Sequence, residues 1–140
     1  MSADPYPKPL PDLKDPDWAP FWAGVREERL LAQRCSACGT LRFPPLPICD
    51  QCLEEASEWE EVSTTGTIWS YIVYHRAFHP GFEDEVPYVV AIVENQEGLR
   101  FTGNVIGDRQ HIAVGVPVTA VFEVATPEVT LVKWSVGPRA

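Results

Sequence analysis

The sequence has 140 residues, enough for one compact domain or for two small modules that share a core. Hydrophobic residues make up 45% of it and charged residues 22%, a composition typical of a globular protein. Its formal net charge is −9, from 20 acidic and 11 basic residues. This charge disfavours general nucleic-acid binding, which depends on Lys and Arg contacts to phosphate.

The N-terminal stretch has no basic segment followed by an apolar one, and no apolar run approaches the length of a transmembrane helix. We therefore expect a soluble cytoplasmic protein that acts without a membrane partner. In that compartment a group of cysteines indicates a metal or redox site more often than a set of disulfides.

An extended arm and a short helix are predicted for the N-terminal region. Residues 1–16 contain too many prolines for a helix. A helix is expected over 17–29, with Asp17 as its N-cap and Pro20 in its first turn. An apolar stripe with spacings of three and four runs along this helix: Trp18, Phe21, Trp22 and Val25. Such a stripe packs on a core or, alternatively, is offered to another subunit or to the apolar part of a ligand.

All the cysteines lie within residues 35–52, CSACGTLRFPPLPICDQC, as two Cys-x-x-Cys pairs ten residues apart: Cys35, Cys38, Cys49 and Cys52. Each pair brings two sulfurs to the spacing of two tetrahedral corners, so two facing turns complete a closed Cys₄ site. Gly39 follows the first pair and supplies a residue for positive φ where the knuckle turns. The set has no vacant corner, which predicts a structural role for the metal.

Structural Zn²⁺ is the expected metal, because thiolate ligation couples its binding to folding of the ribbon. An iron site of the rubredoxin type uses the same ligands and stays an alternative. Two disulfides are disfavoured in this compartment. A thioredoxin-type motif is also disfavoured, since it needs a single pair at the start of a helix in an α/β pattern.

After an acidic run over residues 54–61 the pattern becomes β. Five segments rich in β-branched and aromatic residues are separated by turn signals: 66–78, 87–95, 98–107, 117–125 and 128–136. No helix of any size is expected between them, which predicts a small barrel, and the five-stranded OB-fold is the commonest such barrel. The predicted fold class is thus mainly β, with a short N-terminal helix, a rubredoxin-like Cys₄ zinc ribbon and a C-terminal OB-fold barrel. The expected division is arm and helix 1–29, zinc ribbon 30–60 and OB-fold 61–140.

The order of these motifs resembles a family of zinc-ribbon plus OB-fold proteins associated with acyl-CoA, long catalogued as a domain of unknown function. The resemblance spans residues 17–136 and rests on the knuckle spacing followed by four short motifs: CG, PP, GTIWSY and PYVVAIVE. The chain departs from the family at Leu46, where Arg often follows PP, and at Asn95–Gln96.

The resemblance implies a non-catalytic accessory subunit of a thiolase-fold enzyme that acts on CoA thioesters. Such partners include thiolases, acyltransferases and aldolases that cleave steroid side chains. The partner would supply the nucleophile or base, and this chain would stabilise it and help bind the shared acyl-CoA substrate.

The residues themselves indicate no independent catalytic site. The four cysteines are assigned to a metal, and no Ser, Asp or Cys motif accompanies the three histidines: His75, His79 and His111. We therefore expect no catalytic residue, and no activity in the isolated chain.

Candidate contacts with a partner or with acyl-CoA lie in the predicted helix and barrel strands: Trp18, Phe21, Trp22, Trp69, Tyr71, Arg76 and Arg100. Strict alternation along 66–78 places Trp69, Tyr71, Val73 and His75 on one face, and Ile68, Ser70, Ile72 and Tyr74 on the other. Arg76 and Arg100 are candidates for a CoA phosphate or a partner carboxylate, with ordinary surface ion pairs as the alternative.

Two functions of other classes stay open on the sequence alone. One is a stand-alone module that binds acyl-CoA or phosphopantetheine. The other is a zinc-ribbon OB protein that binds nucleic acid, which would need a basic stripe with exposed aromatic residues. The net charge of −9 argues against this last reading.

Overall fold

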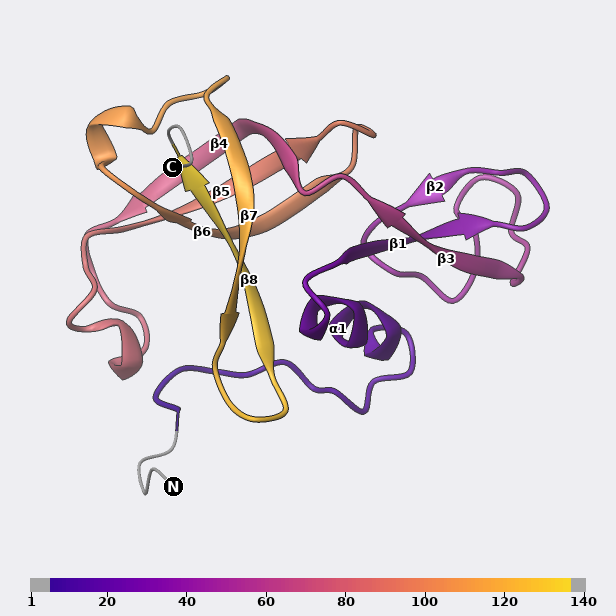
Figure 1. Cartoon of the computed structure of the whole chain (residues 1–140), viewed down its shortest axis with the longest axis horizontal. Helices are drawn as coiled ribbons and strands as arrows, with labels where there is room; N and C mark the ends of the chain where they lie inside the picture. Colours follow the sequence, from indigo (N-terminus) through magenta and orange to yellow (C-terminus); the bar gives the residue numbers. More distant parts are fainter. Residues whose placement is uncertain (1–5, 137–140) are drawn as a thin grey trace.

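A three-stranded antiparallel sheet and a closed five-stranded barrel make up the computed structural model, which describes residues 6–136 (Figure 1). The first five residues of the predicted arm and the last four of the chain lie outside the described residues. The elements follow in this order: α1 (Ala19–Arg26), β1 (Leu30–Cys35), β2 (Leu41–Arg42), β3 (Ser57–Val62), β4 (Thr65–Tyr74), η1 (Pro80–Phe82), β5 (Tyr88–Asn95), β6 (Arg100–Ile106), η2 (Arg109–His111), β7 (Pro117–Val124) and β8 (Thr130–Val136). The predicted fold class is confirmed, and each of the five predicted barrel segments corresponds to one barrel strand, although β4 begins one residue before its predicted segment.

Helix α1 begins later than predicted. Trp18 occupies the N-cap position, and no side chain caps the helix, so the prediction of an Asp17 cap is wrong. The carbonyl of Asp15 instead accepts hydrogen bonds from the N–H groups of Trp18 (3.1 Å) and Ala19 (2.8 Å), which leads a preceding turn directly into the helix. Pro20 lies in the first turn as expected. The helix has 8 residues, and no helix among residues 6–136 has the length and apolar character needed to cross a bilayer.

The ribbon sheet has the strand order β2-β1-β3. Strand β1 is its centre and pairs along its whole length with β3, from Leu30 opposite Val62 to Cys35 opposite Ser57. Leu30 and Ala32 of β1 are completely buried and join the core that the sheet shares with α1 and the barrel. The ribbon is therefore packed on the rest of the molecule through its central strand.

The barrel has the order β4-β5-β6-β8-β7 and closes where β7 pairs with β4, as in an OB-fold. Strands β6 and β8 are parallel, and their ladder includes only two pairs, Val105 with Trp134 and Ile106 with Ser135. These pairs lie near the C-terminal ends of both strands. The strands diverge towards their N-terminal ends, so the wall of the barrel is open between the beginning of β6 and the beginning of β8. Helix α1 lies over this part of the barrel, packed against β1, β7 and β8 (Figure 1).

A β-bulge at Trp69 changes which residues of β4 face the core. Ile68 is opposite Val93 and Ser70 is opposite Ile92, so Trp69 is the extra residue. Residues opposite each other in a sheet share a face, so Ile68 lies on the inner face with Tyr71 and Val73, whose partners Ala91 and Val89 are buried. The prediction of uninterrupted alternation is therefore wrong.

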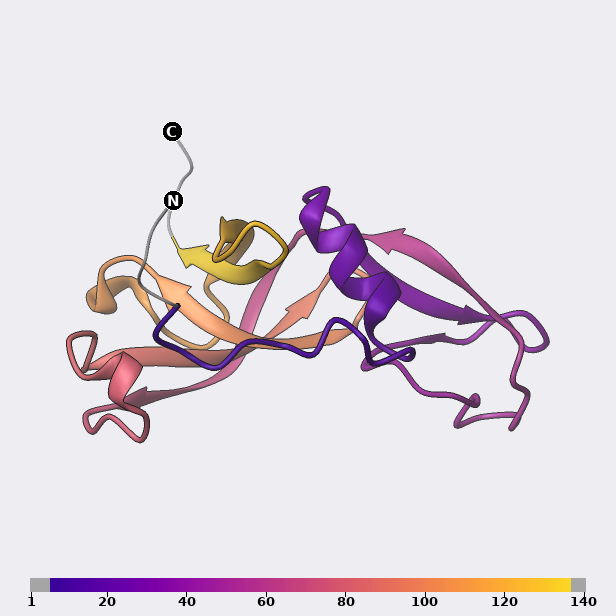
Figure 2. The ribbon, with the colours of Figure 1, turned by 90° about the horizontal axis from the view of Figure 1, so that it is seen from below.

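Strand β4 also ends earlier than predicted, at Tyr74. His75, Arg76 and Phe78 lie beyond it, in the loop that leads through η1 to β5. The N-terminal arm, described from residue 6, has no helix and runs beneath the barrel towards this loop (Figure 2). There Lys8 forms an ion pair with Glu85, and its ammonium lies 4.8 Å from the centre of the Phe82 ring.

Aromatic side chains connect the helix, the ribbon and the barrel. Phe43, in the ribbon loop after β2, lies 5.2 Å from Phe21 of α1 and 4.3 Å from Phe101 of β6, measured between ring centres. Phe101 in turn lies 6.0 Å from Trp134 of β8, which is completely buried. Gly103 leaves room for this indole, because a Cβ at that position would lie 3.2 Å from Cδ1 of Trp134.

The bulge predicts different costs for two alanine substitutions in β4. Ile68 is 1% exposed and Ile72 is 52% exposed, although an unbroken strand would put both on one face. We expect Ile68→Ala to lower the free energy of unfolding by about 2–5 kcal/mol, and Ile72→Ala by less than about 1 kcal/mol. Urea denaturation of both variants checks this. Equal losses would show that the two side chains share one environment.

Candidate functional site

The two Cys-x-x-Cys turns are built alike. In the first, the N–H of Gly39 donates to the carbonyl of Cys35 (3.0 Å); in the second, the N–H of Leu53 donates to that of Cys49 (2.9 Å). A main-chain N–H also reaches the first sulfur of each turn, from Cys38 to Cys35 Sγ (3.5 Å) and from Gln51 to Cys49 Sγ (3.4 Å). Each turn thus presents two sulfurs, as the spacing of the cysteines predicts, and adds backbone N–H donors beside them.

The four sulfur atoms lie within 4.8 Å of one another. Cys35 Sγ is 3.5 Å from Cys52 Sγ, and Cys38 Sγ is 3.7 Å from Cys49 Sγ. Zinc–sulfur bonds of about 2.3 Å place the corners of a tetrahedron about 3.8 Å apart, so this arrangement fits Zn²⁺. The first cysteine of each pair is buried and the second lies nearer the surface. With all four corners taken by protein, the site can hold a structural metal.

The pKa values of Cys35, Cys38 and Cys52 are shifted in opposite directions, so these three thiols do not ionise at one pH. The hydroxyl of Thr40, 3.1 Å from Cys38 Sγ, and the Thr40 N–H lower the pKa of Cys38 to about 6. Backbone donors in the turn, the Cys38 N–H first, lower the pKa of Cys35. The Glu54 N–H also lowers the pKa of Cys52, but burial and hydrogen bonds to the other thiols outweigh it and raise that pKa to about 12. A divalent cation removes this conflict, because it stabilises every thiolate at once.

An ion pair fixes the first turn to the neighbouring strand. Arg34 contacts the Glu60 carboxylate through two nitrogens, Nε at 3.0 Å and Nη2 at 2.7 Å, and donates from Nη1 to the carbonyl of Gly39 (2.7 Å). The hydrogen bonds from Arg34 lower the pKa of the Glu60 carboxyl. This contact is therefore present above the ordinary carboxyl pKa and is lost as the pH falls through the lowered value.

Equivalent positions of the two turns carry different residues. Gly39 has a φ of 78°, which confirms the predicted left-handed conformation, and Leu53 has a φ of 67° at the matching place in the second turn. A left-handed conformation is costly for a residue with a Cβ. The Leu53 side chain is 71% exposed, so burial contributes little to offset this cost.

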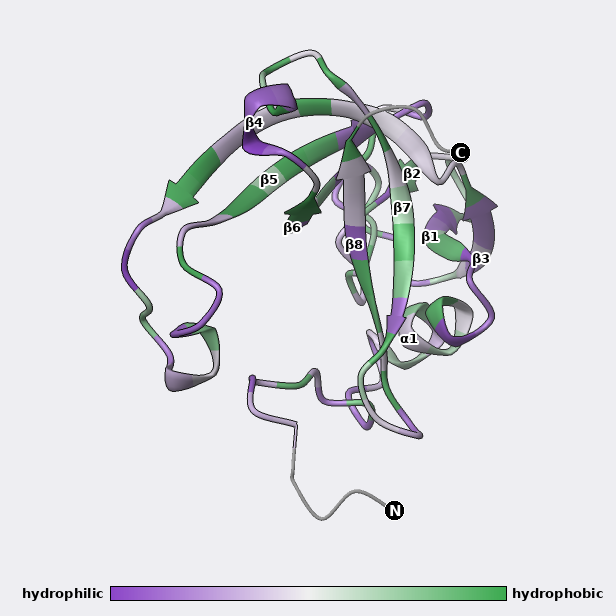
Figure 3. Ribbon diagram, turned by 60° about the vertical axis from the view of Figure 1, so that its left-hand side comes forward, coloured by the Kyte–Doolittle hydropathy of each residue, from purple (hydrophilic) through white to green (hydrophobic). Residues whose placement is uncertain are grey.

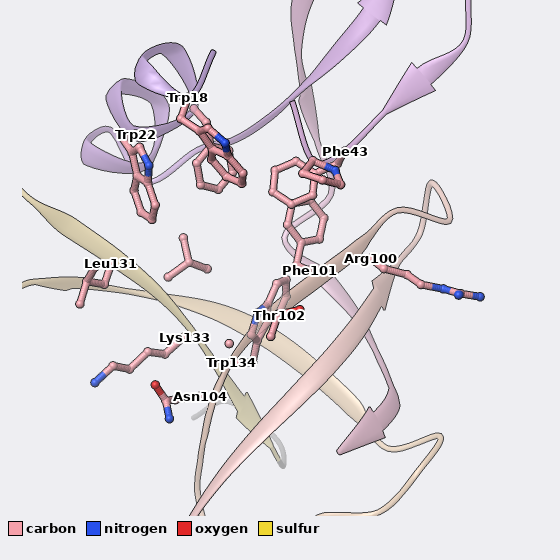
Figure 4. A pocket seen from close by; sticks show the side chains of 14 residues that line it. Trp18, Trp22, Phe43, Arg100, Phe101, Thr102, Asn104, Leu131, Lys133 and Trp134 are labelled. Carbon is pink, nitrogen blue, oxygen red and sulfur yellow. The ribbon is translucent and has the colours of Figure 1, made fainter. Parts of the chain in front are cut away.

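A cleft of about 430 Å³ lies where β6 and β8 diverge, beneath α1 (Figure 4). The N-cap residue Trp18 and two residues of α1, Phe21 and Trp22, form one wall with Phe43. The facing wall comes from the two diverging strands: Phe101, Thr102, Gly103, Leu131, Val132 and Trp134. Phe21, Phe101 and Trp134 are buried in the floor, whereas Trp18 and Trp22 are half-buried. The predicted aromatic stripe thus serves both as core and as the wall of a mostly apolar cleft.

Polar groups stand at the edges of this cleft. Lys133 lies at its border and forms an ion pair with Glu123 (2.9 Å). Arg100 points away from the cleft in Figure 4. Its guanidinium lies 3.8 Å from the centre of the Trp69 ring, and its Nε is 3.3 Å from Glu94. The cleft therefore suits an apolar group, with cations held at its rim.

The structure brings together only some of the predicted contact residues. Trp18, Phe21, Trp22 and Arg100 all border the cleft. Trp69 stacks on Arg100 outside it and is 46% exposed, while Tyr71 is 36% exposed on the far part of β4. Arg76 lies in the following loop, its guanidinium 5.5 Å from the centre of the Phe78 ring. The role of these residues in binding stays a prediction.

The histidines occupy peripheral positions. His79 accepts a hydrogen bond from the N–H of Gly81 through Nδ1 (3.0 Å), which caps η1. His75 and His111 are exposed, one after the end of β4 and one at the end of η2.

Sequence reasoning missed the residues that complete the cleft: Phe43, Phe101, Leu131, Lys133 and Trp134. Phe43 lies in the ribbon, next to the two prolines, and its proximity to the barrel follows only from the packing of the modules. The alternation of β8 gives a partial signal, because Val132 and Trp134 occur two residues apart.

A four-cysteine ribbon followed by a five-stranded barrel of this order defines the class of zinc-ribbon OB-fold proteins. The chain belongs to the DUF35 family of that class, a family that also includes ChsH2. Residues 22–58 match the model described as the rubredoxin-like zinc ribbon domain of ChsH2, and residues 59–123 match that of its C-terminal OB-fold domain. The resemblance stated from the sequence is thereby confirmed.

Several relatives have names or known structures. A "DUF35 domain-containing scaffold protein" of Methanocaldococcus jannaschii is 37% identical over 114 residues, which cover 79% of each chain. The "3-oxo-4,17-pregnadiene-20-carboxyl-CoA hydratase alpha subunit" of Mycobacterium tuberculosis is 36% identical over 91% of this chain. A solved structure described as "Ltp2-ChsH2(DUF35) aldolase" contains a chain that is 39% identical, with a TM-score of 0.80, and the match covers 92% of this chain and 98% of that one.

The match to the hydratase subunits is partial in length. This chain spans 43% of the Mycobacterium tuberculosis protein and 35% of a "Probable enoyl-CoA hydratase alpha subunit" of Thermomonospora curvata, to which it is 44% identical over 115 residues. The match to a chain of the aldolase structure, by contrast, extends over almost the whole of both chains.

The cysteine site predicts one zinc ion per chain. We expect elemental analysis of the purified protein to find one Zn²⁺, and Cys49→Ser to lose it together with the order of the ribbon, because metal binding and folding are coupled. Ser36→Ala, in the first turn but outside the ligand set, should retain the metal. One iron per chain with visible absorption would contradict the assignment of zinc.

The left-handed conformation of Leu53 predicts a stabilising substitution. We expect Leu53→Gly to raise the free energy of unfolding by up to about 1 kcal/mol, because glycine adopts this conformation without a steric cost. Leu53→Ala is the matched control, since it removes the same exposed side chain but keeps the Cβ, and it should bring no gain. Thermal unfolding of both variants, loaded with metal, distinguishes them. An equal effect of both would assign the gain to the lost side chain instead.

Proposed function

We propose that this chain is a non-catalytic accessory subunit of a heteromeric complex that acts on acyl-CoA, and that its partner is a thiolase-fold enzyme that makes or breaks carbon–carbon bonds. The partner supplies the reactive groups. This chain stabilises the partner and contributes a binding surface for the acyl-CoA substrate. Steroid side-chain cleavage by a retro-aldolase is one such reaction.

The observation that carries this proposal is the similarity to a chain of the aldolase structure. It extends over 92% of this chain and 98% of that chain at 39% identity, so nearly all of this chain corresponds to one component of a structure described as an Ltp2-ChsH2(DUF35) aldolase. The names of the partial matches agree, because each is an alpha subunit of a hydratase that acts on a CoA ester.

The arrangement of the functional groups supports a binding role. The cysteines are gathered in one metal site with no open corner, and His79 is used in capping a short helix. The cleft between α1, β6 and β8 is lined mainly by aromatic and aliphatic side chains, and its volume of about 430 Å³ suits the apolar part of a substrate. Acyl-CoA contacts at Trp18, Phe21 and Trp22 belong to this proposal.

The same cleft favours a second candidate, a stand-alone module that binds acyl-CoA. Its walls come entirely from this chain, so it does not need a partner to exist. The cations nearest to it, Arg100 and Lys133, are both engaged by carboxylates, which leaves the phosphates of CoA without a ready partner there. The accessory-subunit reading is therefore the stronger one.

Co-expression with a thiolase-fold enzyme of the same organism tests the proposal. We expect the two chains to elute together in gel filtration, and cleavage or condensation of the CoA ester to require both. A substitution in the active site of the partner should abolish turnover. Omission of the present chain should lower the stability of the partner and its affinity for the substrate. Separate elution of the two chains, with full activity of the partner alone, would refute the proposal.

Calorimetry on the isolated chain with the same CoA ester provides the control. In the accessory-subunit reading the ester binds weakly until the partner completes the site. Binding with micromolar affinity to the isolated chain would instead favour the stand-alone module.

A further inference from the structure

The middle of strand β5 is apolar on both faces. Its inward residues Val89, Ala91 and Val93 are buried in the barrel, and Val90 and Ile92 face outward between Tyr88 and Glu94 at the two ends of the strand. A strand that is apolar on both faces is typical of one that is covered on both. Figure 3 shows this hydrophobic character along β5, which lies between β4 and β6. The barrel core covers the inner face of β5, and the same pattern implies that another surface covers its outer face.

The neighbouring strands extend this surface with both apolar and uncharged polar side chains. Ile72 of β4 lies opposite Val90, and Thr102 and Asn104 of β6 lie opposite Ile92 and Val90. Ile106, two residues further along β6, shares their face. We call this the outer sheet face: Ile72, Val90, Ile92, Thr102, Asn104 and Ile106.

The outer sheet face remains accessible to solvent in the chain itself. Ile72 is 52% exposed and Ile106 is 43% exposed. Helix α1 packs instead against β1, β7 and β8. At the beginning of β5 the loop after β4 lays the Phe82 ring on Tyr88, with ring centres 4.8 Å apart, so it covers only that border.

The distribution of charge on and around the outer sheet face indicates which kind of partner would bind it. The six residues of the outer sheet face are uncharged, and Glu94 and Arg100 beside them pair with each other. An uncharged centre with charged groups at its rim is the usual composition of a protein–protein interface. Two copies of this chain would each bring a net charge of −9 to the contact, and this repulsion opposes self-association.

The position of the outer sheet face next to the cleft also indicates which protein would bind it. Thr102 and Asn104 belong both to the outer sheet face and to the lining of the cleft. A protein that covers the face therefore borders the mouth of the cleft, where an acyl group would emerge. This geometry suits an enzyme subunit that receives the substrate.

We propose that the outer sheet face of β4, β5 and β6 is the docking surface for the catalytic subunit, which would meet it with a complementary apolar patch that is neutral or basic at its rim. This inference rests on the proposed function. Trp69, stacked under Arg100 at the edge of the same strands, adds the aromatic and arginine residues that often anchor interfaces.

Glutamate substitutions at exposed positions test the surface without removing core side chains. Ile72→Glu and Ile106→Glu should each weaken binding to the co-expressed thiolase-fold subunit by about tenfold or more, because each buries a charge in an apolar contact. Val124→Glu and Val114→Glu are matched controls, since these valines are 74% and 67% exposed on β7 and in the loop before it. Both controls should bind like the unsubstituted chain, and thermal unfolding should show all four variants folded.

The outcomes separate the surface from the function on which it rests. If the unsubstituted chain binds the enzyme subunit and Ile72→Glu and Ile106→Glu bind equally well, the docking surface is wrong while the proposed function stands. If the unsubstituted chain does not bind, the proposed function fails and this inference fails with it. If the isolated chain forms a dimer in gel filtration that Ile72→Glu dissociates, a second copy is the occupant and the proposal is overturned.

Discussion

The contact on which the rest of the structure depends is the aromatic packing around Phe43. This side chain comes from the ribbon but lies against Phe21 of the helix and Phe101 of the barrel. Along the chain, the ribbon and barrel are joined only through the short segment between β3 and β4. Because β6 and β8 pair over two positions and then separate, the core of the barrel would meet water at that opening. The aromatic rings close the opening and, in doing so, fix the helix, ribbon and barrel to one another.

Much of this architecture could be predicted from the sequence because its signals are local. The spacing of the cysteines determines the two turns, and Gly39 marks the left-handed position in the first of them. The five barrel segments are visible because β-branched residues recur between turn residues. Leu53 carries no such signal, since a leucine in a left-handed conformation follows from the symmetry of the two turns and not from its own preference.

Non-local features could not be predicted in the same way. The bulge at Trp69 depends on the register between β4 and β5, and a shift of one residue moves every later side chain to the opposite face. The N-cap of α1 depends on how the arm turns at Asp15. The cleft depends on the divergence of β6 and β8, which lie far apart in sequence. Trp18 and Trp22 could be selected as candidates, but the residues opposite them could not.

The position of Phe43 gives the metal site an effect beyond its own surroundings. Phe43 belongs to the segment between the two cysteine turns, so a metal bound by the four sulfurs would hold one wall of the cleft together with those turns. Oxidation or chelation at the cysteines would release that wall and open the aromatic floor to solvent. A change in the redox state or the metal content of the cell would therefore alter the shape of the apolar cleft, although no cysteine lines it.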